Sequence, residues 1–164
     1  MEHYAHLALA YGLACWLPPF REMREHKRFL WALAANTCDI IDYYILKPMI
    51  NPGGFIPALL PHSWPWAHRS FTHTIWFAIA LALIARAFLP KWHDSLSFLV
   101  LELLSHYIPD IFTAKMPLFM PLLPPIGPIK PFNRAINHIG LSIGVLLALV
   151  RPSCRLARRA ARLT

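Results

Sequence analysis

The chain has 164 residues and a formal net charge of +8, and 57% of its residues are hydrophobic while only 15% are charged. Its mean hydropathy of +0.43 exceeds that of ordinary soluble domains, so the composition predicts a single integral membrane domain over residues 1–164. The basic residues lie in short clusters between apolar segments, which favours a role in membrane topology and argues against binding of nucleic acid.

Five apolar segments follow in chain order, and each approaches the length of about 20 residues that a spanning helix needs. They predict an all-α, polytopic membrane bundle of about five transmembrane helices. The first and last segments are short, so we expect them to be tilted or to lie partly in the interface. The first carries Glu and His near its start, where a signal peptide carries Lys or Arg, and it is expected to be retained. The segments are residues 3–19, 29–47, 71–90, 95–113 and 135–150.

The connections between these segments are of two kinds. Segments 20–28 and 90–94 and the tail 151–164 are polar and basic, whereas 48–68 and 114–134 are nearly uncharged and rich in proline. Because basic loops stay on the cytoplasmic side, this pattern predicts a multi-pass protein of the bacterial inner membrane. Its basic C-terminal tail is expected to be cytoplasmic, both proline-rich loops are expected outside, and membrane lipid is the expected partner.

Three cysteines are odd in number and widely spaced, with no CxxC pair. This pattern indicates neither a disulfide framework nor a thiolate zinc site. Cys15, Cys38 and Cys154 are therefore interpreted as small buried hydrophobic residues.

Ionisable side chains within the predicted helices lie mostly toward the outer ends, and burying them in lipid is costly without a functional reason. Residues three or four positions apart share a helix face, so His106 and Asp110 point together. The same holds for Asp39 and Asp42, and the common depth predicts a single buried site. Imidazoles next to carboxylates suit zinc, manganese or iron, whose charge offsets the cost of burying the acids. One or two divalent ions are therefore expected.

Simpler interpretations remain for single residues. The aspartates would form salt bridges with Arg69 if no metal were present. A lone histidine on a membrane helix is more often a hydrogen-bonded packing residue than a ligand, which is the interpretation given to His3 and His138. Glu102, one turn before His106, is either a group that orients this histidine or a separate functional acid.

Two sequence motifs resemble those of a known family. HRSFTHT at 68–74 resembles the element H-R-G-x-T-H-S of the LexA-regulated membrane-bound metal-dependent hydrolase family, and HYIPDIFT at 106–113 resembles its element H-x-x-x-D-x-x-T. An early histidine, His6, and an aspartate pair, Asp39 and Asp42, occur in the same order. The resemblance implies a metal-dependent hydrolase and names no substrate.

The resemblance runs from about residue 3 to about residue 120 and has three departures. The family's glycine after the arginine is Ser70, the two aspartates are separated by two residues instead of one, and Pro109 interrupts the second motif. Proline cannot donate a backbone hydrogen bond, so Pro109 is expected to kink the helix beside the site.

Roles for individual residues follow from their chemistry. Arg69 suits an anion, because guanidinium groups and helix N-termini both favour phosphate, and Thr72 and Thr113 are expected to bind the substrate with it. His68 is the candidate proton donor, and Asp42 is either a metal ligand or the general base. The predicted metal ligands are His6, Asp39, Asp42, His73, His106 and Asp110.

Both proline-rich loops are apolar, so a site beneath them would meet lipids more readily than soluble metabolites. The favoured function is hydrolysis of a lipid or polyprenyl phosphate at the outer leaflet, with metal-activated water as the nucleophile. A small transporter or membrane regulator with an intramembrane metal or proton site is the alternative, although the inner helix halves carry few acids besides Glu102. A membrane di-iron oxidase ranks third, because the nine histidines are scattered.

Overall fold

The computed structural model describes residues 2–46, 71–89, 91–113, 116–119, 122–124, 126–127 and 135–160. Within these ranges the protein consists of helices and turns, together with one isolated bridge between Met116 and Ile126. The all-α part of the predicted fold class is therefore confirmed for the described part of the chain.

The first part of the chain folds into short helices with breaks between them. Helix α1 (His3–Ala14) ends before Pro18 and Pro19, which lack the backbone N–H that a longer helix would need. A 3-10 turn, η1 (Phe20–Glu22), then leads to α2 (Glu25–Ala34).

Two short helical turns after α2 carry the acidic residues of the site. The side chain of Asn36 donates to the carbonyl oxygen of Ala32 (2.8 Å), close to the end of α2. Helix α3 (Thr37–Ile40) follows and carries Asp39 in its first turn. It continues directly into the π-helical segment η2 (Ile41–Leu46), and Asp42 lies in the first turn of that segment.

The next described segment begins with the 3-10 turn η3 (Phe71–His73), followed by α5 (Ile75–Ala85). Thr74 caps α5, because its Oγ1 accepts a hydrogen bond from the backbone N–H of Phe77 (3.4 Å). The backbone N–H of Ile75 donates to the carbonyl oxygen of Leu118 (2.8 Å). These contacts fix His73 at the N-terminal end of α5.

Helix α6 (Trp92–Glu102) changes to π-helical geometry in η4 (Leu103–Tyr107) and returns to α-helical geometry in α7 (Ile108–Ile111). Pro109 has no N–H to donate to the carbonyl of Ser105, so the α-helical hydrogen bond is missing there. The wider π turn ends at Tyr107, two residues before the proline, and such turns are frequent at functional sites.

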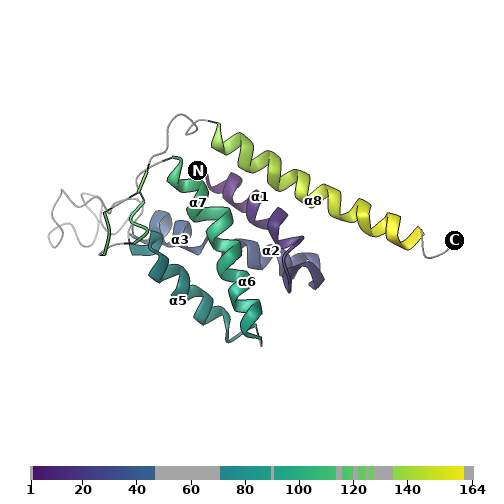
Figure 1. Ribbon diagram of the computed structural model, residues 1–164, viewed down its shortest axis with the longest axis horizontal. Helices are drawn as coiled ribbons and strands as arrows, with labels where there is room; N and C mark the ends of the chain where they lie inside the picture. Colours follow the sequence, from purple (N-terminus) through teal and green to yellow (C-terminus); the bar gives the residue numbers. More distant parts are fainter. Residues whose placement is uncertain are drawn as a thin grey trace.

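Helix α8 (Ile136–Ala160) lies along α1, as Figure 1 shows. The two backbones approach closely at Gly12 and Gly144, where a Cβ on either residue would lie 2.4 Å from a backbone atom of the opposite helix. Small residues at a crossing let helices pack backbone to backbone. Trp16 adds a hydrogen bond from its Nε1 to the carbonyl oxygen of Leu147 (2.9 Å). This packing holds one side of α1 while the other side faces the site.

The main apolar core lies between α1, α2, α5 and α6 and is built around Phe20, Leu89, Phe98 and Leu101. The ring of Trp31 packs edge-on against Phe98, with centroids 5.3 Å apart. A second, smaller buried cluster contains Cys38, Ala78, Tyr107 and Met116. This second cluster lies next to the polar residues described below.

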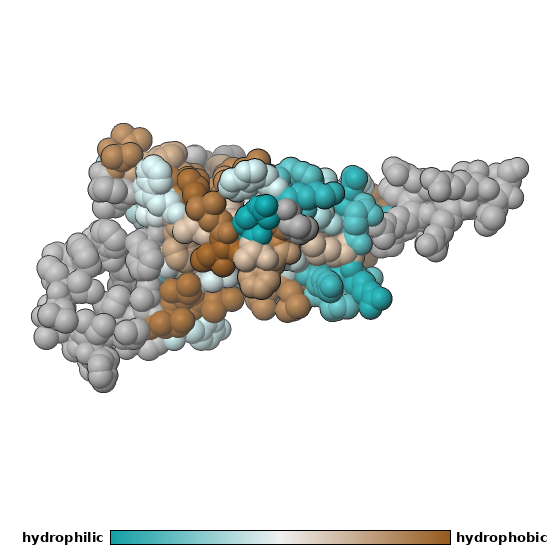
Figure 2. All heavy atoms as spheres, turned by 90° about the horizontal axis from the view of Figure 1, so that it is seen from below, coloured by the Kyte–Doolittle hydropathy of each residue, from teal (hydrophilic) through white to brown (hydrophobic). Residues whose placement is uncertain are grey.

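Large hydrophobic side chains also lie on the surface. On α5, Trp76, Leu83 and Ile84 are 48%, 54% and 60% exposed. On the face shown in Figure 2, hydrophobic residues gather in the middle and to the left of it, and hydrophilic residues lie to the right of the middle. Exposed apolar area of this kind is typical of surfaces that contact lipid or another protein.

The prediction of about five transmembrane helices is wrong. Across the described ranges, none of the helices has the length and the apolar character needed to cross a membrane. The bilayer core is about 30 Å thick, whereas α1, with 12 residues, is about 18 Å long, and α2, α5 and α6 are shorter. Helix α8 has 25 residues, but its apolar part ends at Val150 and Arg151 follows. The inside and outside assignments, including a cytoplasmic C-terminus, relied on five spans and have no support.

Candidate metal centre

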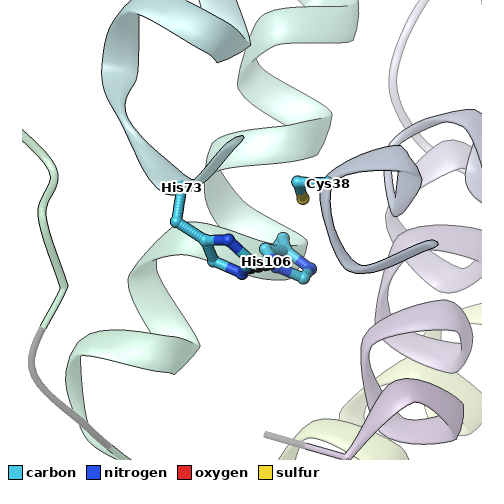
Figure 3. Close-up of side chains that lie close together, drawn as sticks. All are labelled: Cys38, His73 and His106. Atoms are coloured by element: carbon cyan, nitrogen blue, oxygen red, sulfur yellow. Dashed lines mark hydrogen bonds between the residues drawn. The ribbon is translucent and has the colours of Figure 1, made fainter. Parts of the chain in front are cut away.

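Five ionisable side chains from five helical segments meet in the interior. They come from α1, α3, η3, η4 and α7, and each is at most 4% exposed. Figure 3 shows two of them, the imidazoles of His73 and His106, facing one another. The five residues are His6, Asp39, His73, His106 and Asp110.

Three ligand atoms of this group form a nearly regular triangle. The Nε2 atoms of His73 and His106 lie 3.2 Å apart, and Oδ1 of Asp39 lies 3.3 Å from the first and 3.5 Å from the second. A tetrahedral zinc ion with bonds of about 2.0–2.1 Å holds neighbouring ligand atoms about 3.3–3.4 Å apart. The triangle therefore matches one face of a tetrahedral metal site.

The hydrogen bonds of His73 determine which ring nitrogen faces the centre with a lone pair. Its Nδ1 lies 3.0 Å from Oδ2 of Asp42 and 3.1 Å from Oγ1 of Thr72, and the Thr72 hydroxyl itself donates to Asp42. Both neighbours are oxygen acceptors for this nitrogen, so Nδ1 carries the hydrogen. In the neutral ring, Nε2 then presents its lone pair to the centre, as a metal ligand does.

His6 is oriented in the same way. Its Nδ1 lies 2.7 Å from the carbonyl oxygen of Ser105, which can only accept, so the ring donates from Nδ1. Its Nε2 lies 3.1 Å from Oδ1 of Asp110, and its ring stacks on His106 with centroids 4.1 Å apart. A lone pair facing a carboxylate is unfavourable unless a proton or a cation lies between them. His6 and Asp110 thus extend the same cluster of imidazole nitrogens and carboxylate oxygens, where a proton or a cation would be favourable.

The electrostatics of the buried groups also favour a cation at this place. Burial alone would raise the pKa of Asp39, but the hydrogen bond from His73 and the charges of His106 and His6 hold it below its usual range. Burial opposes the charged form of His73, yet its hydrogen bonds to Asp39 and Asp42 raise its pKa. Burial and the nearby charge of His6 lower the pKa of His106. In the protein alone, protons provide the positive charge that a metal ion would provide.

The remaining predicted site residues lie around this centre or outside the described residues. Asp42 is placed on the far side of His73, where it contacts Nδ1 at 3.0 Å. Thr72 is fully buried against Asp42, and the hydroxyl of Thr113 donates to the carbonyl oxygen of Asp110 (3.1 Å). Arg69, the predicted anion-binding residue, and His68, the predicted proton donor, fall outside the described residues.

Two histidines that were interpreted as packing residues differ in position. His138 is exposed in the first turn of α8. The Nδ1 of His3 lies 2.8 Å from Oδ2 of Asp39, and the side chain of His3 is 46% exposed. Asp39 therefore connects the buried centre, through Oδ1, with an accessible imidazole, through Oδ2.

Sequence reasoning missed two members of the site. The sulfur of Cys38 lies within 4.8 Å of ligand nitrogens of both His73 and His106. The hydroxyl of Tyr107 donates to the carbonyl oxygen of Thr72 (2.7 Å) and so holds η3 in place. The available signal was adjacency, because Cys38 precedes Asp39 and Tyr107 follows His106 in the sequence.

A cavity of about 340 Å³ opens beside the centre, and Asp39 and His3 form part of its lining. Most of the other walls are apolar or aromatic. They are formed by Tyr4, Leu7, Leu33, Asn36, Ile40 and Tyr44. The cavity gives a ligand from outside a route to the carboxylate of Asp39.

Glu102 is a fully buried acid whose two carboxylate oxygens have no hydrogen-bond partner among the described residues. Burial raises its pKa to about 9. The structure does not place it in contact with His106, so the suggestion that it orients this histidine stays a prediction. At neutral pH it is a protonated, uncharged acid.

Replacing Glu102 by glutamine is expected to stabilise the protein, and more so as the pH rises. The acid binds a proton up to about pH 9 when folded but only below about 4.5 when unfolded. Folding therefore takes up a proton between these values, and the free energy of unfolding falls by about 1.4 kcal/mol per pH unit as the pH increases. Glutamine has the shape of the protonated acid and needs no proton. We expect Glu102→Gln to gain roughly 3 kcal/mol at about pH 7.

Thermal unfolding in one detergent at about pH 5.5 and about pH 8 measures this difference. Glu22→Gln is the matched control, because the side chain of Glu22 is 70% exposed. An equal effect of Glu102→Gln at both pH values would contradict the prediction.

A model of the family described as YdjM inner membrane protein matches residues 1–162 of the chain. No curated protein and no solved structure matches it. The matched range includes every residue of the candidate centre. The family description names the inner membrane, in agreement with the predicted location, and it names no activity.

Proposed function

The chain belongs to the YdjM inner membrane protein family, and from this premise we propose that it is a metal-dependent hydrolase that acts on a lipid or polyprenyl phosphate. The observation that carries the proposal is the triangle of His73, His106 and Asp39 ligand atoms, with sides of 3.2, 3.3 and 3.5 Å. Two imidazoles and one carboxylate that leave further positions open are typical of catalytic metal sites.

A divalent ion bound there would supply a Lewis acid for the phosphoryl oxygen and lower the pKa of the attacking water. The chain's own residues keep the site in the required form. Asp42 orients His73, the Ser105 carbonyl orients His6, and Thr113 holds Asp110. These contacts fix the ligand atoms before a substrate arrives, which reduces the cost of reorganisation during the reaction.

The cavity beside Asp39 supports a lipid-like substrate. Its polar end carries His3 and Asp39, while Leu7, Leu33 and Ile40 provide apolar walls. A phosphate ester with a hydrocarbon chain fits such a division, because the charged group needs polar partners and the chain needs apolar surface. His3 lines this cavity beside Asp39 and contacts its carboxylate, so it is the described side chain best placed to exchange a proton with a bound substrate.

Metal-dependent release of phosphate from lipid phosphates in mixed micelles tests the proposal. The purified full chain is compared with Asp110→Asn, which keeps the shape of the side chain but removes the charge beside His6. We expect hydrolysis of at least one lipid phosphate by the wild type, abolished by a chelator, and a rate about 100-fold lower for the variant. A soluble phosphate monoester serves as the comparison substrate and should be hydrolysed poorly.

A wild-type protein that holds a metal but hydrolyses none of the lipid phosphates would overturn this proposal. The metal or proton site of a transporter or regulator would then be the better interpretation. A protein that prefers the soluble monoester would contradict the lipid assignment alone.

A further inference from the structure

Cys38 lies on α3 directly before Asp39, and its side chain is fully buried. Its sulfur and one ring nitrogen each of His73 and His106 all lie within 4.8 Å of one another. Figure 3 shows the sulfur directed toward the imidazole of His106, with His73 alongside.

We propose that Cys38 is a further ligand of the metal ion and binds it as a thiolate, which makes the centre selective for zinc over manganese. This inference rests on the metal centre of the proposed function and adds the identity of the metal to it. It replaces the interpretation of Cys38 as a small hydrophobic packing residue.

The sulfur of Cys38 has to move slightly closer to the two imidazoles before it can bind the same metal ion. A zinc–sulfur bond is about 2.3 Å and a zinc–nitrogen bond about 2.0–2.1 Å, so tetrahedral coordination places the sulfur about 3.6 Å from each nitrogen. The sulfur lies within 4.8 Å of both nitrogens. A shift of about 1 Å, within the reach of a χ1 rotation and a small movement of α3, therefore brings the sulfur into bonding distance.

The chemistry of the donor set agrees with this geometry. Thiolate is a soft ligand that favours zinc, whereas manganese favours carboxylates and water. A divalent ion bound by one thiolate, the Asp39 carboxylate and two neutral imidazoles carries no net charge, which suits a fully buried site. Zinc can expand from four to five ligands during a reaction, so a water molecule still has a position beside these four groups. The thiol loses its proton to solvent when the metal–sulfur bond forms, so binding releases one proton from Cys38.

Cys15 provides an internal contrast. It is 3% exposed, about as buried as Cys38, but its sulfur lies 3.8 Å from Nη1 of Arg28. It belongs to neither of the two groups of metal-ligating side chains found among the described residues. Burial alone therefore does not distinguish the two cysteines, while the imidazoles beside Cys38 do.

Cobalt(II) titration of the full chain in detergent tests the inference. Cys15→Ser and Cys154→Ser are introduced first, so that Cys38 is the single cysteine of the background protein. We expect visible d–d bands of a low-symmetry cobalt site together with a near-ultraviolet thiolate-to-cobalt charge-transfer band. Adding Cys38→Ser should remove the charge-transfer band, keep the visible bands, and release one proton fewer per cobalt bound.

The outcomes separate this inference from the proposed function. Visible bands without the charge-transfer band in the background protein would show that a metal binds without Cys38 and would overturn the inference alone. The absence of both kinds of band would overturn the metal centre itself. If Cys38→Ser does not fold, Cys38→Ala is used, with far-ultraviolet circular dichroism as the check. Zinc should outcompete excess manganese in the wild type, and this preference should be reduced in either variant.

Discussion

Replacing Asp39 by asparagine is expected to abolish metal binding and hydrolysis together. Oδ1 of Asp39 completes the triangle with the two Nε2 atoms, and Oδ2 contacts His3 at 2.8 Å. Asparagine keeps the size of the side chain but removes the negative charge that balances the cation. Because a buried ion without this charge is poorly compensated, we expect metal affinity to fall by at least about 100-fold.

Metal content by elemental analysis and thermal unfolding with and without a chelator measure the loss. A metal present at about a hundred times its dissociation constant stabilises the folded state by about 2.7 kcal/mol. The chelator should therefore lower the melting temperature of the wild type and leave that of Asp39→Asn unchanged.

Asp94→Asn is the matched control for this experiment. Asp94 is also a buried aspartate, 5% exposed, and Nε2 of His93 lies 3.0 Å from its Oδ1. Asp94 lies in the first turn of α6, whereas His106 of the centre lies in η4, which follows the C-terminal end of that helix. The control should keep its metal and its response to chelator. Asp39→Asn retaining one metal per chain at unchanged affinity would rule out the triangle as the binding site.

The sequence indicated which polar side chains lie together, while their role as metal ligands stays a prediction. The spacing of His106 and Asp110 predicted two groups pointing together, and the structure brings both to the same buried place as Asp39 and His73. The role of each atom could not be anticipated. Which nitrogen of His73 faces Asp42 depends on how η3 packs against α3 and η2, and no pattern within one segment contains that information.

The ends of the helices were harder to predict from the sequence than the site residues. Hydropathy gives the length of an apolar segment but does not show where the backbone hydrogen bonds of a helix are interrupted. The segment 3–19 reads as one apolar run, yet α1 ends at Ala14 before two prolines. The segment 95–113 reads as one helix, yet Pro109 and the π turn before it divide it into three parts. The sequence therefore predicted helical class correctly and helix length wrongly.

Asp42→Asn distinguishes the three roles that its position allows. Oδ2 of Asp42 accepts from Nδ1 of His73 at 3.0 Å, and the hydroxyl of Thr72 donates to its other oxygen. A carboxylate in this position fixes the ring of a metal-binding histidine and increases its basicity, and losing it typically costs 10–100-fold in affinity. We therefore expect Asp42→Asn to bind one metal per chain with an affinity about 10–100-fold lower than the wild type.

Rates measured at saturating metal separate this expectation from the alternatives. If Asp42 orients His73, added metal should restore most of the hydrolysis, because the triangle of ligand atoms is intact once it is filled. If Asp42 is the general base, affinity should be unchanged while the rate falls and the pH profile loses its acidic limb. If it is a ligand, metal stoichiometry should fall as for Asp39→Asn. Thr72→Val should weaken binding less than Asp42→Asn, and the two effects should not add, because the threonine acts through the carboxylate it contacts.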